Sequence, residues 1–109
     1  MSIKIVKYGV RELEKEFGPL TFGRLLSSFR LGEEWTQGEM AQVLRISKQS
    51  LCDLEKGRRI PTPGRAASIA RKLKMHEGSF VQLALQDELK RENLDLFVHI
   101  SETKSAKIS

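Results

Sequence analysis

Long polar side chains gather on one face of the helix predicted for residues 48–56. If Leu51 points to the core, a rotation of ~100° per residue puts Leu54 beside it. On the opposite face lie Gln49, Cys52, Asp53 and Lys56, with Lys48 at the exposed start of the helix. Amide, carboxylate and ammonium groups can hydrogen-bond to base edges in the major groove of DNA. This face predicts contact with DNA bases, and the candidate residues are Lys48, Gln49, Cys52 and Asp53.

Asp53 and Cys52 each allow more than one interpretation. Asp53 could accept a hydrogen bond from a cytosine amino group. It could equally repel phosphates so that wrong registers on DNA are disfavoured, or it could form a local ion pair with Lys56 or Lys48. Cys52 could act as a redox switch if nearby lysines stabilised its thiolate. The simpler interpretation of Cys52 is a small, unreactive side chain.

Basic and hydroxyl-bearing side chains around this helix are candidates for phosphate contacts. Such contacts position a domain on DNA without specifying a base sequence. Arg58 and Arg59 follow the helix directly as a pair suited to phosphates, and Arg59 is the strongest candidate. The candidates from this part of the chain are Ser50, Lys56, Arg58, Arg59 and Arg65.

Two short helices joined by a tight turn, within residues 35–61, must position these side chains. Thr36 can cap the first helix, and Glu39 can complete a capping box with it. Ser47 is suited to cap the second helix. Gly57 ends that helix, since glycine readily adopts the left-handed conformation that often follows a helix. The stretch therefore predicts a helix, a turn and a second helix that presents the polar face.

This stretch resembles the Cro/C1-type (XRE-like) helix-turn-helix family of phage repressors, bacterial regulators and antitoxins. The resemblance covers roughly residues 20–85, and its matches fall at fixed spacing. It implies a compact five-helix bundle that binds DNA through the second helix of the motif, the recognition helix. The matching residues are Thr36–Gln37, Met40–Ala41, Leu44, Ile46–Ser47, Leu51, Glu55, Gly57, Arg59 and Pro61.

The resemblance also implies roles for single residues. Lys48 and Gln49 match the family's base-contacting positions, and lysine suits guanine whereas glutamine suits adenine. Gln37 matches a glutamine that contacts a DNA phosphate and supports the recognition helix. Arg30 and Glu55 match an arginine and a glutamate that commonly form an ion pair between the first helix and the recognition helix.

Three further helices complete the predicted bundle. Thr21 can cap a helix over residues 22–31, and Thr62 can cap another with Pro63 in its first position, where the missing amide hydrogen costs little. The last helix runs roughly over residues 79–92, and its buried face carries Phe80, Leu83 and Ala84. We therefore expect a mainly α fold, a compact five-helix Cro/C1-type bundle.

Short segments flank the bundle at both ends. Residues 2–8 are predicted to form a strand and residues 10–17 a helix. Residues 94–100 alternate as a strand does. One face would carry Leu94, Leu96, Val98 and Ile100, and the other Asp95, Phe97 and His99. A lone strand leaves its backbone groups unpaired, so we expect the two strands to pair, either within one chain or across a dimer.

The 109 residues are enough for one domain. We expect an N-terminal strand and short helix over 1–19, a helix-turn-helix domain over 20–92, and a C-terminal strand with a frayed tail over 93–109. The net charge is +5, and residues 20–75 carry eleven Lys and Arg against five Asp and Glu. Because the basic excess lies in the helix-turn-helix segment, the charge predicts a polyanionic partner.

Other kinds of site find little support in the sequence. The single cysteine excludes an internal disulfide, and a cysteine-based zinc site would need more thiols. His76 and His99 have no neighbouring ligands, and no catalytic triad or phosphate-binding glycine loop is evident. We therefore expect that the protein is not an enzyme and that it binds no metal and no cofactor. We find no secretory signal and no stretch near the ~20 apolar residues of a membrane span, so we expect a cytoplasmic protein outside the membrane.

These observations predict a sequence-specific DNA-binding repressor. It would bind double-stranded DNA as a homodimer at a palindromic operator, with two recognition helices in successive major grooves, and would repress its own operon. The alternative is an antitoxin that binds a cognate toxin and represses the shared operon, because the flanking segments exceed what a bare DNA-binding domain requires. A third hypothesis is a protein-interaction module, which Asp53 on the outward face favours.

Overall fold

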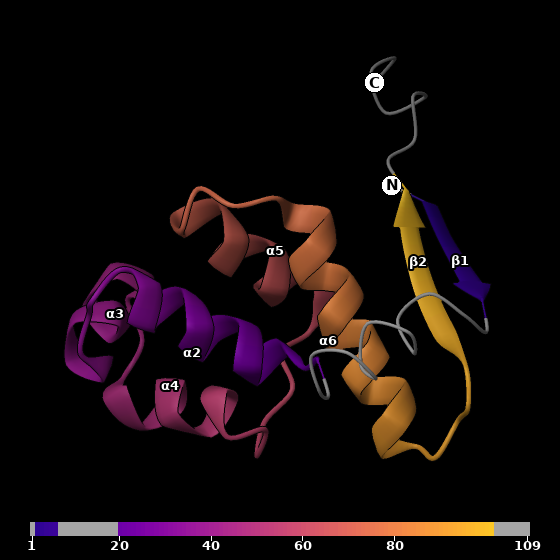
Figure 1. Cartoon of the computed structure of the whole chain (residues 1–109), viewed down its shortest axis with the longest axis horizontal. Coiled ribbons are helices and arrows are strands. Elements are labelled where there is room, and N and C mark those ends of the chain that lie inside the picture. The colour runs from indigo at the N-terminus through magenta and orange to yellow at the C-terminus, as the bar shows by residue number, and fades with distance from the viewer. Residues whose placement is uncertain (1, 7–19, 102–109) are drawn as a thin grey trace.

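The computed structural model contains five helices and two short strands in the residues that it describes, 2–6 and 20–101 (Figure 1). The helices are α2 (Phe22–Gly32), α3 (Gln37–Leu44), α4 (Lys48–Glu55), α5 (Pro63–Lys72) and α6 (Glu77–Arg91). The strands are β1 (Ser2–Val6) and β2 (Phe97–Ser101). The mainly α, five-helix fold predicted from the sequence is confirmed, whereas the helix predicted over residues 10–17 lies outside the described residues.

Side-chain caps start the helices where the sequence predicts them. The hydroxyls of Thr21, Thr36, Ser47 and Thr62 each accept a hydrogen bond from the backbone N–H three residues on. Thr36 and Glu39 form the full capping box. The start of α6 differs from the prediction, because His76 caps it and the helix begins at Glu77. The His76 Nδ1 accepts from the backbone N–H of Ser79 at 3.3 Å, the role that an oxygen plays in the other caps.

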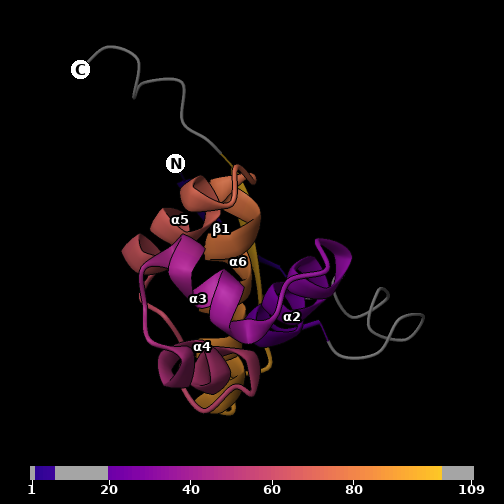
Figure 2. The same cartoon turned by 90° about the vertical axis from the view of Figure 1, so that its left-hand side faces the viewer.

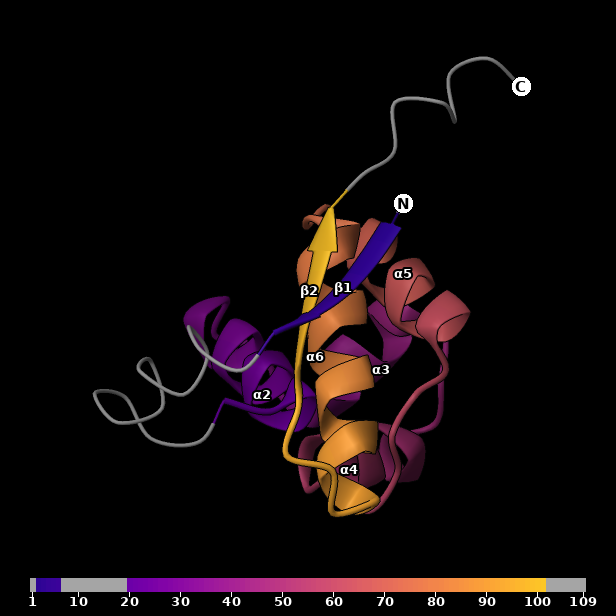
Figure 3. The same ribbon diagram turned by 90° about the vertical axis from the view of Figure 1, so that its right-hand side faces the viewer.

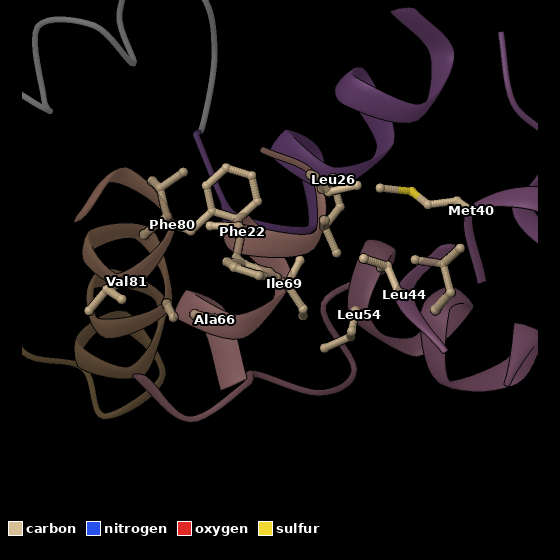
Figure 4. Close-up of a cluster of buried hydrophobic side chains, with 14 of the residues drawn as sticks. Phe22, Leu26, Met40, Leu44, Leu54, Ala66, Ile69, Phe80 and Val81 are labelled. Atoms are coloured by element: carbon tan, nitrogen blue, oxygen red, sulfur yellow. The ribbon is translucent and has the colours of Figure 1, made fainter. Parts of the chain in front are cut away.

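The core lies where the five helices meet (Figure 4). The inward faces of α2, α3 and α4 supply fully buried side chains, among them Leu26, Met40 and Leu51. Phe22 and Phe80 pack edge to face with ring centroids 5.8 Å apart, a favoured aromatic geometry. The other large apolar side chain with under 2 % exposure is Leu44. Continuous burial from α2 to α6 makes the bundle one body.

The two strands form an antiparallel sheet on the side of α6 away from the other helices (Figure 3). Ser2 pairs with Ser101 and Val6 with Phe97, so the strands pair within one chain here. The strand begins three residues later than predicted, because Asn93 (φ 60°) and Leu94 still terminate α6 through hydrogen bonds to the carbonyls of Lys90 and Leu89. Leu94 is therefore 46 % exposed.

Phe97 also departs from its predicted environment. The alternation placed it on the face opposite Val98, yet both side chains are buried, at 4 % and 3 % exposure. Alternating burial requires one face of a strand to meet solvent. At its start β2 is enclosed on more than one side, since it lies against α6 and beside β1.

Gln86 joins the sheet to the helical bundle, a role that the sequence pattern did not suggest. Its side chain is buried among apolar residues of α6. Its Nε2 donates to the carbonyl of Leu96 at 2.7 Å, and its Oε1 accepts from the N–H of Val98 at 2.8 Å. One turn earlier, Gln82 accepts from the N–H of Ile100 at 3.3 Å. Side chains of α6 thus satisfy backbone groups along one edge of β2.

Candidate nucleic-acid interface

Close packing against α2 holds α4 in place. Leu51 and Leu54 on its inward face are 0 % and 4 % exposed. Gly23 of α2 lies against the end of α4, because a Cβ built there would overlap the carbonyl oxygens of Leu54 and Glu55. A glycine inside a helical pattern is a sign of such close approach. The inward face of α4 is therefore buried, and its opposite face is left on the surface.

One residue, Arg45, ends α3 at the turn into α4 (Figure 2), and a side chain of α5 hydrogen-bonds to this turn. Arg45 adopts the left-handed conformation, with φ 57°. Lys72 of α5 donates from Nζ to the carbonyl of Leu44, the last residue of α3, at 2.9 Å. A cation at a helix C-terminus also interacts favourably with the helix dipole. These contacts set the angle at which α4 leaves α3.

Glu55 links three helices through one carboxylate. Its Oε2 accepts from Arg30 Nε at 2.8 Å, and its Oε1 accepts from Arg30 Nη2 at 3.2 Å. Oε1 also accepts from Gln37 Nε2 at 3.1 Å, and Arg30 Nη1 donates to the carbonyl of Trp35 at 3.1 Å. The side chains of Arg30 and Glu55 are only 15 % and 6 % exposed. The ion pair expected from the resemblance is present, and Gln37 is in position to support α4.

The outward face of α4 is accessible as the helical projection indicates. Lys48, Gln49 and Lys56 are exposed, and Cys52 and Asp53 are half-buried. These residues lie on the side of α4 opposite the buried Leu51 and Leu54. The structure thus places the four candidates for base contact on one accessible face.

Asp53 is the centre of a hydrogen-bonded group on this face. Its Oδ1 accepts from Gln49 Nε2 at 3.0 Å and from Arg58 Nε at 2.9 Å. Arg58 also donates from Nη2 to the Sγ of Cys52 at 3.4 Å. The ion-pair partner is therefore Arg58, whereas the sequence had suggested Lys56 or Lys48. The hydrogen bond from Arg58, and then that from Gln49, lower the pKa of Asp53 below its usual value.

The candidate phosphate ligands lie on the surface around α4. Arg58, Arg59, Arg65 and Lys56 are exposed, and Ser50 is half-buried with its hydroxyl accepting from Ser47 Oγ at 2.9 Å. Among the described residues, neither Arg59 nor Arg65 has a side-chain hydrogen bond or ion pair. Their guanidinium groups are therefore available to an anionic partner.

Comparison with protein families settles what kind of domain this is. A family model described as a helix-turn-helix domain, of the Cro/C1 (XRE-like) group, matches residues 21–78, more than half of the chain. The chain belongs to this family. Membership implies that this helix-turn-helix protein binds DNA, and such domains are typically not enzymes. Comparison with curated proteins found no match, and comparison with solved structures found none either.

A metal site and a membrane span can both be assessed in the described part of the helix-turn-helix protein. Residues 2–6 and 20–101 contain no group of three or more His, Cys, Asp or Glu side chains that could hold a metal ion. Within the same ranges, every helix is too short or too polar to cross a membrane. The outward face of α4 is the best-defined candidate site of this part of the protein.

Proposed function

We propose that the protein is a dimeric, sequence-specific repressor that binds a palindromic operator, acts in the cytoplasm and represses its own operon. The observation that carries this proposal is the contrast between the two faces of α4. The inward face is fixed by Leu51, Leu54 and the Glu55 ion pair. The outward face presents exposed Lys48 and Gln49. A rigidly held helix with an accessible polar face is suited to contact base edges, since the positions of its side chains are set before DNA binds.

The proposed chemistry divides between bases and phosphates. Lys48 would donate to guanine O6 or N7, and Gln49 would make a bidentate contact with adenine N6 and N7. Gln49 keeps its Oε1 and its second N–H for this purpose, because Asp53 engages only one hydrogen of Nε2. Arg59 and Arg65 would neutralise phosphates. Repression would follow from occlusion of the promoter.

The proposal is tested by selecting bound sequences from a random-sequence duplex library with the full chain. We expect enrichment of a palindrome whose half-sites lie one helical turn apart, about 34–36 Å, and tight binding of DNA upstream of the protein's own gene. Fluorescence anisotropy with a shuffled duplex provides the control. Equal, weak binding to selected and shuffled duplexes would contradict sequence-specific repression.

An antitoxin role is the second candidate, and one observation favours it. The β1–β2 sheet and all but the first two residues of α6 lie outside the matched residues 21–78. They could therefore bind a further protein without occupying α4. Co-expression with a small neighbouring reading frame, followed by co-purification and growth rescue, tests this role. The protein-interaction module gains less support, because Arg58 and Gln49 already engage the carboxylate of Asp53 that suggested it.

A further inference from the structure

Four arginines line a single pocket of about 260 Å³ on the flank of α4. That volume is far larger than the ~30 Å³ share of one liquid water, so the pocket has room for a phosphate group. Its walls come from one side of α4 and the following loop, the start of α5, and the end of α6. The polar side chains that line it are Ser50, Arg58, Arg59, Thr62, Arg65 and Arg91.

The charge in this pocket is only partly offset by carboxylates. Arg58 is paired with Asp53, and Arg91 with Glu88, whereas Arg59 and Arg65 have no ion pair with any described residue. The pocket also lies at the N-terminus of α5, the positive end of that helix dipole. Guanidinium groups match phosphate oxygens with paired N–H donors. A phosphate is therefore the ligand class that this pocket suits best.

We infer that the pocket binds one phosphate of the DNA backbone, and that Arg91 is one of its ligands. This inference rests on the proposed DNA-binding role of α4. The major groove is about 12 Å wide and a helix with its side chains measures about 10–12 Å across. A helix in the groove therefore brings its flanks against the bordering backbones. The pocket adjoins the outward face, because Arg58 both lines it and hydrogen-bonds to Asp53.

Arg91 can reach a phosphate at little cost. Both of its hydrogen bonds to Glu88 use the same nitrogen, Nη2, at 2.7 Å to each carboxylate oxygen. Its Nε and Nη1 groups take no part in that pair. The two side chains are 57 % and 43 % exposed, and exposed ion pairs are weak. Arg91 lies beyond the family match at residues 21–78, so α6 would extend the DNA-binding surface of the motif.

Arg91→Gln and the matched control Arg71→Gln test the inference. Both arginines lie in the last turn of a helix, pair with a nearby glutamate and have similar side-chain exposure, 57 % and 62 %. The α5–α6 connection that follows Arg71 lies at the opposite end of the molecule from α4 and the end of α6 (Figure 1). Thermal melts followed by circular dichroism confirm that both variants fold.

The measurement is the salt dependence of binding to the duplex that the wild type selects. For Arg91→Gln we expect the slope of log K against log salt to fall by about 0.9 per bound subunit, with the base preference unchanged. Arg91→Lys should retain most of the slope, and Arg71→Gln all of it. An unchanged slope for Arg91→Gln would overturn the inference and leave the proposed function standing.

Neutral methylphosphonates, placed one at a time along the selected duplex, locate the contact. We expect one position per half-site where neutralisation weakens wild-type binding but has no further effect on Arg91→Gln. If titrated inorganic phosphate shifts the amide resonances around the pocket while no methylphosphonate position couples to Arg91, the pocket is a free-anion site and the inference is wrong. Should the wild type select no sequence, the proposed function fails, and the slope on a random duplex still tests Arg91.

Discussion

At the scale of single residues, the outward face of α4 is a connected group. Asp53 engages Gln49 and Arg58, the first a candidate for base contact and the second for phosphate contact. One carboxylate therefore orients an amide and a guanidinium on the same accessible surface. A side chain ordered before binding loses less conformational entropy when it meets DNA. We therefore predict that Asp53 affects DNA recognition through Gln49 and Arg58.

We predict that Gln49→Ala weakens binding to the selected duplex by roughly 1–3 kcal/mol and relaxes preference at one base pair. The reason is the loss of a bidentate contact with adenine. Repeating the sequence selection with the variant measures both effects. Gln42→Ala is the control, since Gln42 is exposed on α3 and lies outside the outward face of α4. A base preference identical to that of the wild type would refute the role of Gln49.

Asp53→Asn is predicted to strengthen DNA binding, whereas Gln49→Ala should weaken it. It removes a negative charge beside the DNA and frees Arg58, so affinity for a random-sequence duplex should rise while discrimination falls. Anisotropy titrations on random and selected duplexes measure the two affinities, and their ratio gives the discrimination. If the variant binds the random duplex no more tightly than the wild type does, Asp53 exerts no repulsion.

The pH dependence of Asp53 follows from its hydrogen bonds. Arg58 and Gln49 lower its pKa below the ordinary 3.8, so the carboxylate remains charged throughout the neutral range. Its stabilising contribution is present above 3.8 and is lost as pH falls through the lowered folded-state pKa. Asp53 should therefore keep its negative charge between pH 5 and 8 and contribute no pH dependence to DNA binding there.

At the scale of elements, α4 is too short to be stable alone and is held in place by the neighbouring helices. It has eight residues, and isolated helices shorter than about 12–15 residues are marginal in water. Glu55 connects it to Arg30 of α2 and Gln37 of α3, and Gly23 lets α2 approach its last carbonyls. We therefore expect DNA recognition by α4 to depend on residues of α2 and α3 that hold the helix in place.

Gly23→Ala should destabilise the fold by about 1–3 kcal/mol, the usual cost of overpacking. The added methyl group would overlap the carbonyls of Leu54 and Glu55 and separate α2 from α4, so DNA affinity should fall as well. Gly32→Ala, at the end of the same helix, is the control, because a Cβ there meets nothing within 4 Å. Urea denaturation compares the two. Equal stabilities of the two variants would show that α2 and α4 do not pack closely at Gly23.

At the scale of the whole molecule, the chain is a helical bundle with a two-stranded sheet attached to α6 (Figure 3). Buried apolar side chains hold the bundle together. The sheet depends in addition on Gln86, which bonds both Leu96 and Val98. Phe97 and Val98 add buried apolar side chains at the start of β2. We expect loss of the Gln86 bonds to loosen the sheet more than the helices.

Gln86→Met is predicted to lower the free energy of unfolding by about 1–3 kcal/mol, because it leaves the buried N–H of Val98 and the partly buried carbonyl of Leu96 without their side-chain partner. Amide hydrogen exchange at Val98 should accelerate while exchange in α2 and α5 changes little. Gln82→Met should have a smaller effect, since its bond to Ile100 is longer, at 3.3 Å, and only partly buried. Uniform loss of protection across all helices would show that the sheet and the bundle unfold together.

The sequence by itself determined the starts of α2, α3, α4 and α5, and the inward and outward faces of α4. Hydroxyl caps such as Thr36 and Thr62 act on backbone groups within three residues, and the position of Leu51 sets the faces of its own helix. These effects are local, so they can be derived from spacing alone. The pairing of Arg30 with Glu55 was accessible only through the resemblance to the helix-turn-helix family.

Only the tertiary structure decided which groups meet across the chain. Arg58, rather than a lysine of α4, pairs with Asp53 because the chain leaves the helix at Gly57 and brings that guanidinium back to its surface. Gln86 reaches β2, and Arg91 joins Arg59 and Arg65 around one pocket. These contacts depend on the angles at which whole helices pack, and helix packing reflects the combined fit of many side chains, which no local pattern specifies.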